Sequence, residues 1–255
     1  MGDTQTQTLS KVVFFGPEAV TGPWTDWELQ TGANPSTARQ RAQALKANGD
    51  QFAAVQYGAQ ASYTENYVAK KVSGDAALVL PNVGAVSGGA HIDSVTVTYT
   101  QKDFPTLAVA AHRHADAAGA LQAHDACRVY TPSVKLPPRA VGVPSTLKDT
   151  EGNAIFTCPA GVGMRSLTYA LTVTHVDEPD GEGGHLAGQN RDGVETLTIE
   201  LTGKVVTSEL AIHSSWMLPD SDADSQGNTA ATTKSITLTK HLAYDEAVTP
   251  EGADK

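Results

Sequence analysis

Alternating apolar and polar positions recur along most of this chain. In residues 166–174, Leu, Tyr and Val alternate with Thr and Ala, and residues 196–203 repeat the pattern with Leu and Ile against Thr and Glu. A period of two with many β-branched residues is typical of strands that bury one face. The same alternation predicts strands at 94–100, 104–114 and 235–244. The sequence therefore predicts a mostly β protein, either a β-barrel or a β-sandwich with long loops.

Residues 36–48 are the one stretch whose pattern favours a helix. Ser36 can cap its start, and small apolar residues follow at helical spacing. Asn48-Gly49 closes the stretch with residues that tolerate the left-handed backbone common at helix ends. We expect one short helix at about 36–48 that leans on the sheet.

A glycine-rich segment at 81–90 divides the chain. Before it, residues 1–80 are expected to form an N-terminal segment that carries the helix and packs on the sheet. After it, residues 91–250 are expected to form the main β domain. Within that domain, residues 91–145 and 160–250 both contain strand, histidine, polar loop and strand, so a duplication is an alternative to one unrepeated domain.

The charge and cysteine content narrow the classes of function. The net charge of −10 argues against specific nucleic-acid binding but is compatible with a passage through which DNA slides without adhering. The two cysteines form no paired motif. We expect no signal peptide and no membrane contact, because the chain has neither a cationic apolar leader nor a run of 18 apolar residues.

A polar loop of about 20 residues is expected between the strands at 166–174 and 196–203, and loops of that length are usually functional. It carries several carboxylates but no aromatic residue that would stack on a sugar, so subunit contact or a further Ca²⁺ site is favoured over glycoside hydrolysis. The candidates for inter-subunit contact are Asp177, Glu178, Asp180, Glu182, His185, Leu186, Asn190 and Asp192.

Two groups of residues suggest metal binding. Asp220, Asp222 and Asp224 alternate as Ca²⁺ ligands do, but Ser225 and Ala231 stand where a calcium loop needs Gly and Glu, so a solvated loop is the alternative. His112 and His114 share one face of a predicted strand, and the donors that follow them suit zinc. Those donors are Asp116, His124, Asp125 and Cys127.

No second closely spaced pair of donors completes a zinc motif in that region, so solvated histidines are the alternative and we expect no bound cofactor. The chain also has no GxSxG elbow, no phosphate-binding loop and no GxGxxG after a strand. We therefore expect that the protein is not an enzyme.

The stretch HVDEPDGEGGHLAGQNRDGVETLTIELTG, residues 175–203, resembles structural proteins of tailed bacteriophages, most nearly tail-tube proteins. Residues 67–114 are similar to the same group, whereas the first 50 residues carry no resemblance. The resemblance implies subunits that self-assemble into rings or a tube around a passage for DNA. It also implies that residues 177–192 reach the next ring.

The partners implied are copies of the chain and other virion proteins, with DNA passing unbound and with no membrane. The expected location is the virion, after synthesis in the host cytoplasm. One alternative is a capsid or capsid-decoration protein. The other is a Ca²⁺-dependent carbohydrate-binding β-sandwich, in which Trp216 would lie beside the acidic loop.

Overall fold

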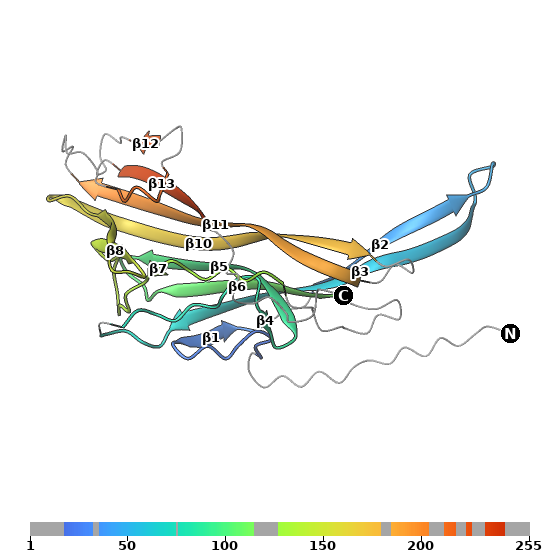
Figure 1. The fold of residues 1–255 in the computed structure, drawn as a ribbon, viewed down its shortest axis with the longest axis horizontal. Coiled ribbons are helices and arrows are strands. Elements are labelled where there is room, and N and C mark those ends of the chain that lie inside the picture. Colours follow the sequence, from blue (N-terminus) through green and yellow to red (C-terminus); the bar gives the residue numbers. More distant parts are fainter. Residues whose placement is uncertain are drawn as a thin grey trace, which may run out of the picture.

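A computed structural model describes residues 18–32, 36–74, 76–114, 127–179, 185–203, 212–217, 223–225 and 233–242 (Figure 1). These residues form antiparallel strands joined by turns and contain no helix. The prediction of a mostly β, sandwich-like protein is confirmed, and the sheet is open rather than closed into a barrel. Within the described ranges, no helix is long and apolar enough to cross a membrane.

Ten strands form a large sheet, and three form a small one. The large sheet comprises β1 (Trp27–Thr31), β2 (Ser36–Leu45), β3 (Gln51–Ala69), β4 (Val86–Ser87), β5 (Ala90–Thr100), β6 (Thr106–His114), β10 (Val162–Pro179), β11 (His185–Gly203), β12 (Ala223–Ser225) and β13 (Thr233–Leu242). Its order is β1-β3-β6-β5-β10-β11-β13-β12, with β2 also beside β3 and β4 beside β5. The small sheet has the order β7 (Val134–Lys135), β8 (Thr146–Asp149) and β9 (Ala154–Thr157).

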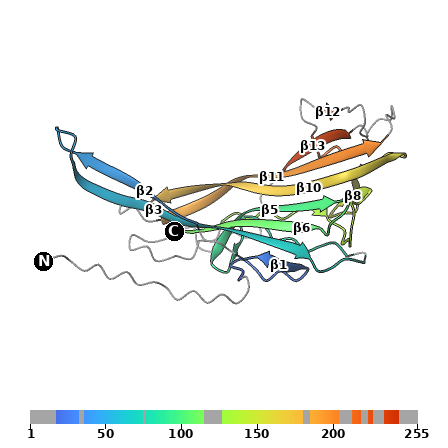
Figure 2. The same ribbon diagram turned by 180° about the vertical axis from the view of Figure 1, so that it is seen from behind.

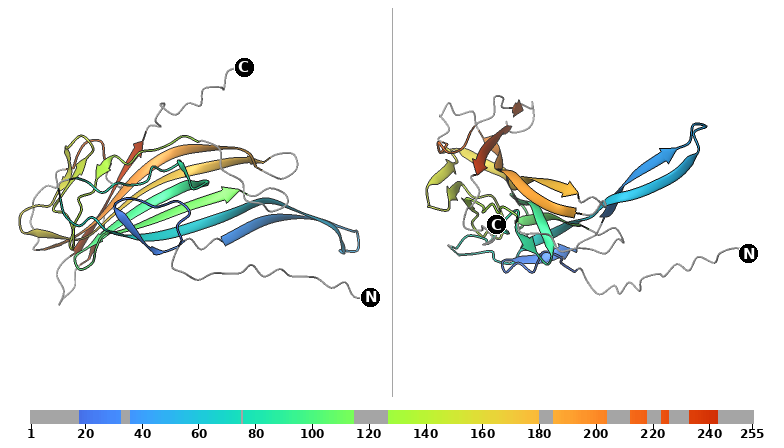
Figure 3. Two further views of the ribbon diagram at one scale, coloured as in Figure 1. Left: turned by 90° about the horizontal axis from the view of Figure 1, so that it is seen from below. Right: turned by 45° about the vertical axis from the view of Figure 1, so that its right-hand side comes forward.

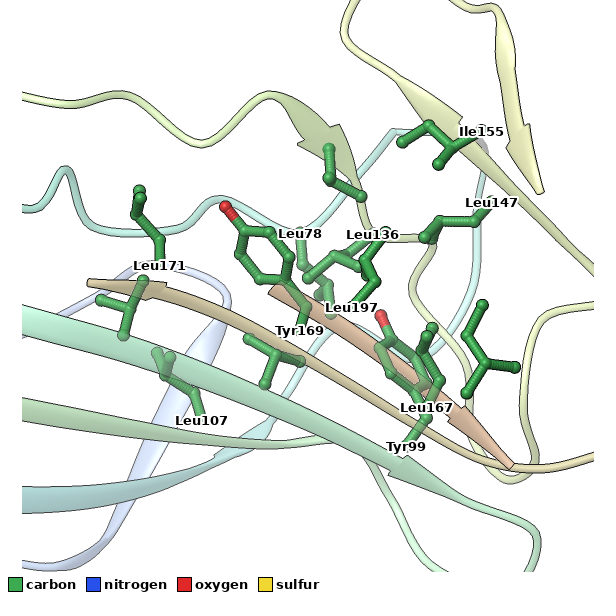
Figure 4. Close-up of a cluster of buried hydrophobic side chains, with 14 of the residues drawn as sticks. Leu78, Tyr99, Leu107, Leu136, Leu147, Ile155, Leu167, Tyr169, Leu171 and Leu197 are labelled. Atoms are coloured by element: carbon green, nitrogen blue, oxygen red, sulfur yellow. The ribbon is translucent and has the colours of Figure 1, made fainter. Parts of the chain in front are cut away.

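The core lies between the large sheet and the segment that carries the small one. Leu136, Leu147 and Ile155 from that segment lie over Tyr99 and Tyr169 of the large sheet, and all five are almost fully buried (Figure 4). Each such side chain contributes about 1.5–3 kcal/mol through burial. This contact explains why every second residue of the central strands is apolar.

The opposite face of the large sheet is lined by threonine and alanine. One continuous row crosses five neighbouring strands, because the register places each threonine of the row opposite the next. These threonines are mostly half-buried, and two of them approach within 3.4 Å between their hydroxyl oxygens. The row consists of Thr106, Thr98, Thr168, Thr198 and Thr237.

The helix expected at 36–48 is wrong: residues 36–45 form β2, which pairs with β3. Asn48-Gly49 lies in the loop that joins the two strands, with Gly49 at φ 89° and its N–H donating to the Lys46 carbonyl at 2.9 Å. Asn-Gly is a strong hairpin signal as well as a helix stop. An isolated helix of this length is marginal in water, and pairing with β3 satisfies the backbone instead.

The long loop expected after residue 174 is also wrong in extent. β10 continues to Pro179 and β11 begins at His185, so polar residues extend the hairpin. The ladder tolerates them because backbone hydrogen bonds do not require apolar side chains.

Two buried glutamates fasten loops to the sheet. Glu65 of β3 accepts hydrogen bonds from the Val20 and Thr21 backbone N–H groups and from the Tyr67 hydroxyl at 2.6 Å. Glu195 of β11 accepts from the Ser133 N–H at 2.6 Å and from the Tyr169 hydroxyl at 2.7 Å. Burial, with the Glu195 charge and hydrogen bond adding to it, raises the pKa of Tyr169 well above its usual value, so the phenol stays a donor.

Gly193→Ala tests the close approach of β11 to the loop before β7. A Cβ at this position would lie 2.2 Å from Cδ1 of Tyr130, whose ring is buried. We expect a loss of about 1–3 kcal/mol in the free energy of unfolding, as is common for overpacking. Gly163→Ala is the control, because its nearest neighbour would lie at 3.8 Å. Urea unfolding of both variants measures the difference, and equal stabilities would contradict the prediction.

Candidate functional site

The large sheet divides into two ribbons at one end (Figures 1 and 2). One ribbon is β2 with the first part of β3, and the other is the hairpin end of β10 and β11. The strands between them stop at the division, since β5 begins at Ala90 and β6 ends at His114, opposite Gln60 of β3. A cluster of histidines and carboxylates lies there.

Each of three strands supplies a pair of polar residues two positions apart, a spacing that directs side chains to the same side of a regular strand. The four imidazole rings pack together, with centroids 4.4 Å apart for His91 and His175 and 4.9 Å apart for His112 and His175. The pairs are His91 and Asp93 on β5, His112 and His114 on β6, and His175 and Asp177 on β10. We call these six residues the histidine cluster.

Asp93 joins two of the rings. Its Oδ1 lies 3.0 Å from Nδ1 of His91 and 2.7 Å from Nδ1 of His112. The ring of His91 is fully buried, whereas the Asp93 side chain is one-third exposed. The carboxylate thus caps the rings of β5 and β6 from the solvent side.

Asp177 joins the other two rings in the same way. Its Oδ1 lies 3.1 Å from Nε2 of His114 and 2.7 Å from Nε2 of His175. Both rings are at least nine-tenths buried, and the Asp177 side chain is 37% exposed. This contact links β6 directly to β10, beyond the end of the strand that separates them elsewhere.

Asn190 of β11 completes the cluster from the far side. Its Nδ2 donates to the Arg128 carbonyl at 2.7 Å, which fixes Oδ1 as the acceptor. Oδ1 then accepts from Nε2 of His91 at 2.9 Å and from Nδ1 of His175 at 2.7 Å. Both ring nitrogens of His175, like both of His91, therefore face an oxygen atom that can accept a hydrogen bond.

The pKa values of His175, His91 and Asp177 are set by the balance between burial and hydrogen bonds. At His175, burial alone would lower the pKa, but the hydrogen bonds to Asp177 and Asn190 outweigh it, and the net shift is upward. At His91, burial dominates and lowers the pKa despite Asp93. For Asp177, burial opposes ionisation, but the hydrogen bonds from its two histidines hold the pKa far below the usual range.

The donor atoms of this region form three sets suited to a metal ion, each with all atoms within 4.8 Å of one another. The largest set has three imidazoles and one carboxylate, and each of the other two has three donors. The sets are His112, His114, His175 and Asp177; His91, Cys127 and His175; and His91, Asp93 and His112.

The predicted contact residues are placed as follows. Asn190 is buried beside the cluster, and Asp177 belongs to the cluster with its side chain 37% exposed. Glu178, Leu186 and Asp192 are exposed. His185 begins β11, and Asp180 and Glu182 lie outside the described residues.

The predicted metal ligands are only partly described. Asp224 lies in β12, and Asp220 and Asp222 lie outside the described residues. Of the zinc candidates, His112, His114 and Cys127 meet at the cluster, with Cys127 Sγ 3.4 Å from the Gly188 carbonyl. Asp116, His124 and Asp125 lie outside the described part of the chain.

Sequence reasoning missed His91, Asp93 and His175 as possible partners of His112. The spacing of two was visible in the sequence, because His91 with Asp93 and His175 with Asp177 repeat the spacing of His112 and His114, but both pairs lie outside the predicted strands 94–100 and 166–174. Only the strand order brings these pairs together.

Comparison of the sequence with protein-family profiles and with curated proteins gave no match. Function is therefore argued from the chain itself.

Asn190→Ala tests whether this amide holds the cluster together. The change leaves the Arg128 carbonyl and two imidazoles without their amide contacts, so we expect a loss of about 1–3 kcal/mol in unfolding free energy. Gln189→Ala is the matched control on the exposed neighbour. Chemical unfolding monitored by circular dichroism measures both, and an equal effect at the two positions would contradict a bridging role for Asn190.

Proposed function

We propose that this protein is a non-enzymatic virion structural protein that assembles with copies of itself into rings or a tube around a passage for DNA. The observation that carries the proposal is the β2–β3 ribbon, which extends from the sheet as an arm (Figure 3). We define the arm as residues 36–58.

The arm lacks the features that stabilise a strand pair by itself. Among the described residues, no third strand pairs with the outer edge of β2. The described side chains of β2 are exposed, apart from Ala44, which is half-buried. A two-stranded ribbon is at best marginally stable in water, and its free edge presents unpaired N–H and C=O groups. A neighbouring subunit would pair with that edge and cover it.

The ends of both ribbons carry exposed apolar residues that suit such contacts. Leu45 at the end of β2 is 58% exposed, and Leu186 on the β10–β11 ribbon is 61% exposed. Isolated exposed leucines are ordinary, but these lie on ribbons with little core behind them. The sequence-based candidate, residues 177–192, remains a second proposed contact beside the arm.

The threonine-lined face of the large sheet supports the proposed passage for DNA. It offers hydroxyl and methyl groups across five strands, without a row of Lys or Arg that would hold phosphates. In the proposed tube this face lines the passage, and the acidic net charge of the chain keeps DNA from adhering.

The carbohydrate-binding alternative gains no support from Trp216. This residue is 5% exposed and packs in the core, with the Lys240 ammonium 5.9 Å from its ring centroid. A sugar-stacking tryptophan needs an exposed ring face, so we carry this alternative no further.

Leu45→Asp tests the arm as a subunit contact. We expect the wild-type chain at high concentration to form rings or tubes in negative-stain electron microscopy and to elute as an oligomer. The variant should elute as a folded monomer with an unchanged melting temperature, because Leu45 is largely exposed within the chain.

Val141→Asp is the control, since Val141 is 50% exposed and lies in the connection between β7 and β8, which belongs to neither ribbon. It should assemble like the wild type. A wild-type chain that stays monomeric under all conditions would contradict self-assembly. Closed shells would favour the capsid alternative, and normal tubes from Leu45→Asp would exclude this residue of the arm as a contact.

A further inference from the structure

We infer that His112, His114, His175 and Asp177 form a binding site for one divalent transition-metal ion, with zinc the best match. The site goes beyond the proposed assembly role and does not depend on it. It also departs from the sequence-based expectation that the protein binds no cofactor.

The donor set has the chemistry of a structural zinc site. Three imidazole nitrogens and one carboxylate oxygen make four ligands, the coordination number that zinc prefers, and all four donor atoms lie within 4.8 Å of one another. At zinc–ligand distances of about 2.0–2.2 Å, tetrahedral donors lie about 3.3–3.5 Å apart. Bringing the donor atoms from separations of up to 4.8 Å to this spacing requires side-chain shifts of about 1 Å.

The hydrogen bonds already orient the rings toward a shared point. Nδ1 of His112 is bound to Asp93 at 2.7 Å, and Nδ1 of His175 is bound to Asn190 at 2.7 Å. Each of these rings would therefore present Nε2 to a metal. A carboxylate or amide on the second ring nitrogen is the usual outer partner of a metal-binding histidine, because it fixes the ring and its tautomer.

Nε2 of His114 and Nε2 of His175 already converge on Oδ1 of Asp177, at 3.1 and 2.7 Å. Protons occupy these contacts when no ion is bound, and a metal replaces them because it requires neutral imidazoles. A divalent ion would also balance the charges of Asp93 and Asp177. That balance favours occupancy where the rings are largely removed from water.

The two competing donor sets are weaker. Both need His91, whose ring nitrogens are already engaged by Asp93 at 3.0 Å and by Asn190 at 2.9 Å. In the set with Cys127, His91 would have to give up its contact with Asp93 or with Asn190, and neither residue is a ligand of that set. Each competing set also supplies three ligands instead of four.

The direct test is cobalt and zinc titration of the full chain after dialysis against a chelator. Cobalt(II) reports geometry through its visible absorption, which is intense in a tetrahedral site, and thiolate ligands add a near-ultraviolet charge-transfer band. We expect one ion per chain by calorimetry, tetrahedral absorption without that band, displacement of cobalt by zinc and a higher melting temperature with zinc.

Substitutions separate the proposed set from its rivals. Asp177→Asn and His175→Gln should each weaken zinc binding more than 100-fold, and the outer-partner variant Asp93→Asn should weaken it about 10–100-fold. Cys127→Ser and His241→Gln should bind as the wild type does, since His241 is an exposed histidine on β13.

Absence of binding by the wild-type chain would overturn the inference. So would a thiolate band that disappears in Cys127→Ser, or wild-type affinity in Asp177→Asn. If a ligand variant fails to fold, the stoichiometry, the absorption of the wild type and the response of Asp93→Asn still decide the question. Assembly into rings or tubes is scored separately, so failure here leaves the proposed function untouched.

Discussion

The hydrogen-bond ladder between β10 and β11 runs from Val162 to Pro179 and carries part of the threonine row and part of the histidine cluster. Its central part is flanked by β5 on one side and β13 on the other, so it fixes the register of the sheet. A slip of one residue would turn Leu167 and Tyr169 to the threonine face and expose them to water. Burial of the apolar core selects this register, and the same register aligns the threonine row on the opposite face.

Beyond the apolar core, the β10–β11 ladder continues as a hairpin that leaves the sheet beside the histidine cluster. A register shift between Thr172 and Thr174, opposite a stretch containing Asp192 at φ 51°, lets the hairpin leave the sheet. β5 is absent beyond Ala90, so the gap between β6 and β10 is filled by imidazole rings. Buried polar groups are costly unless their hydrogen bonds are made, and the two aspartates and Asn190 supply those partners.

The strands with an apolar face could be predicted from the sequence, because burial imposes their alternation. Residues 36–45 could not, since Ala, Gln and Arg favour helix locally and only pairing with β3 makes them a strand. The histidine cluster was half visible. His112 and His114 stand out as a pair, but their partners lie more than 60 residues away at His175 and Asp177. Strand order and register decide that meeting, and neither is a local property.

The positions of the arm and the cluster are physically linked. A ten-residue strand extends about 33 Å, so a rotation of about 10° at its base moves its tip by about 6 Å. An arm that must meet a neighbouring subunit therefore gains from a fixed base. His114 lies opposite Gln60 of β3, where the arm joins the sheet, and Asp177 ties His114 to β10. A metal ion across these residues would hold β6 and β10 together and reduce the ordering entropy lost when the arm docks.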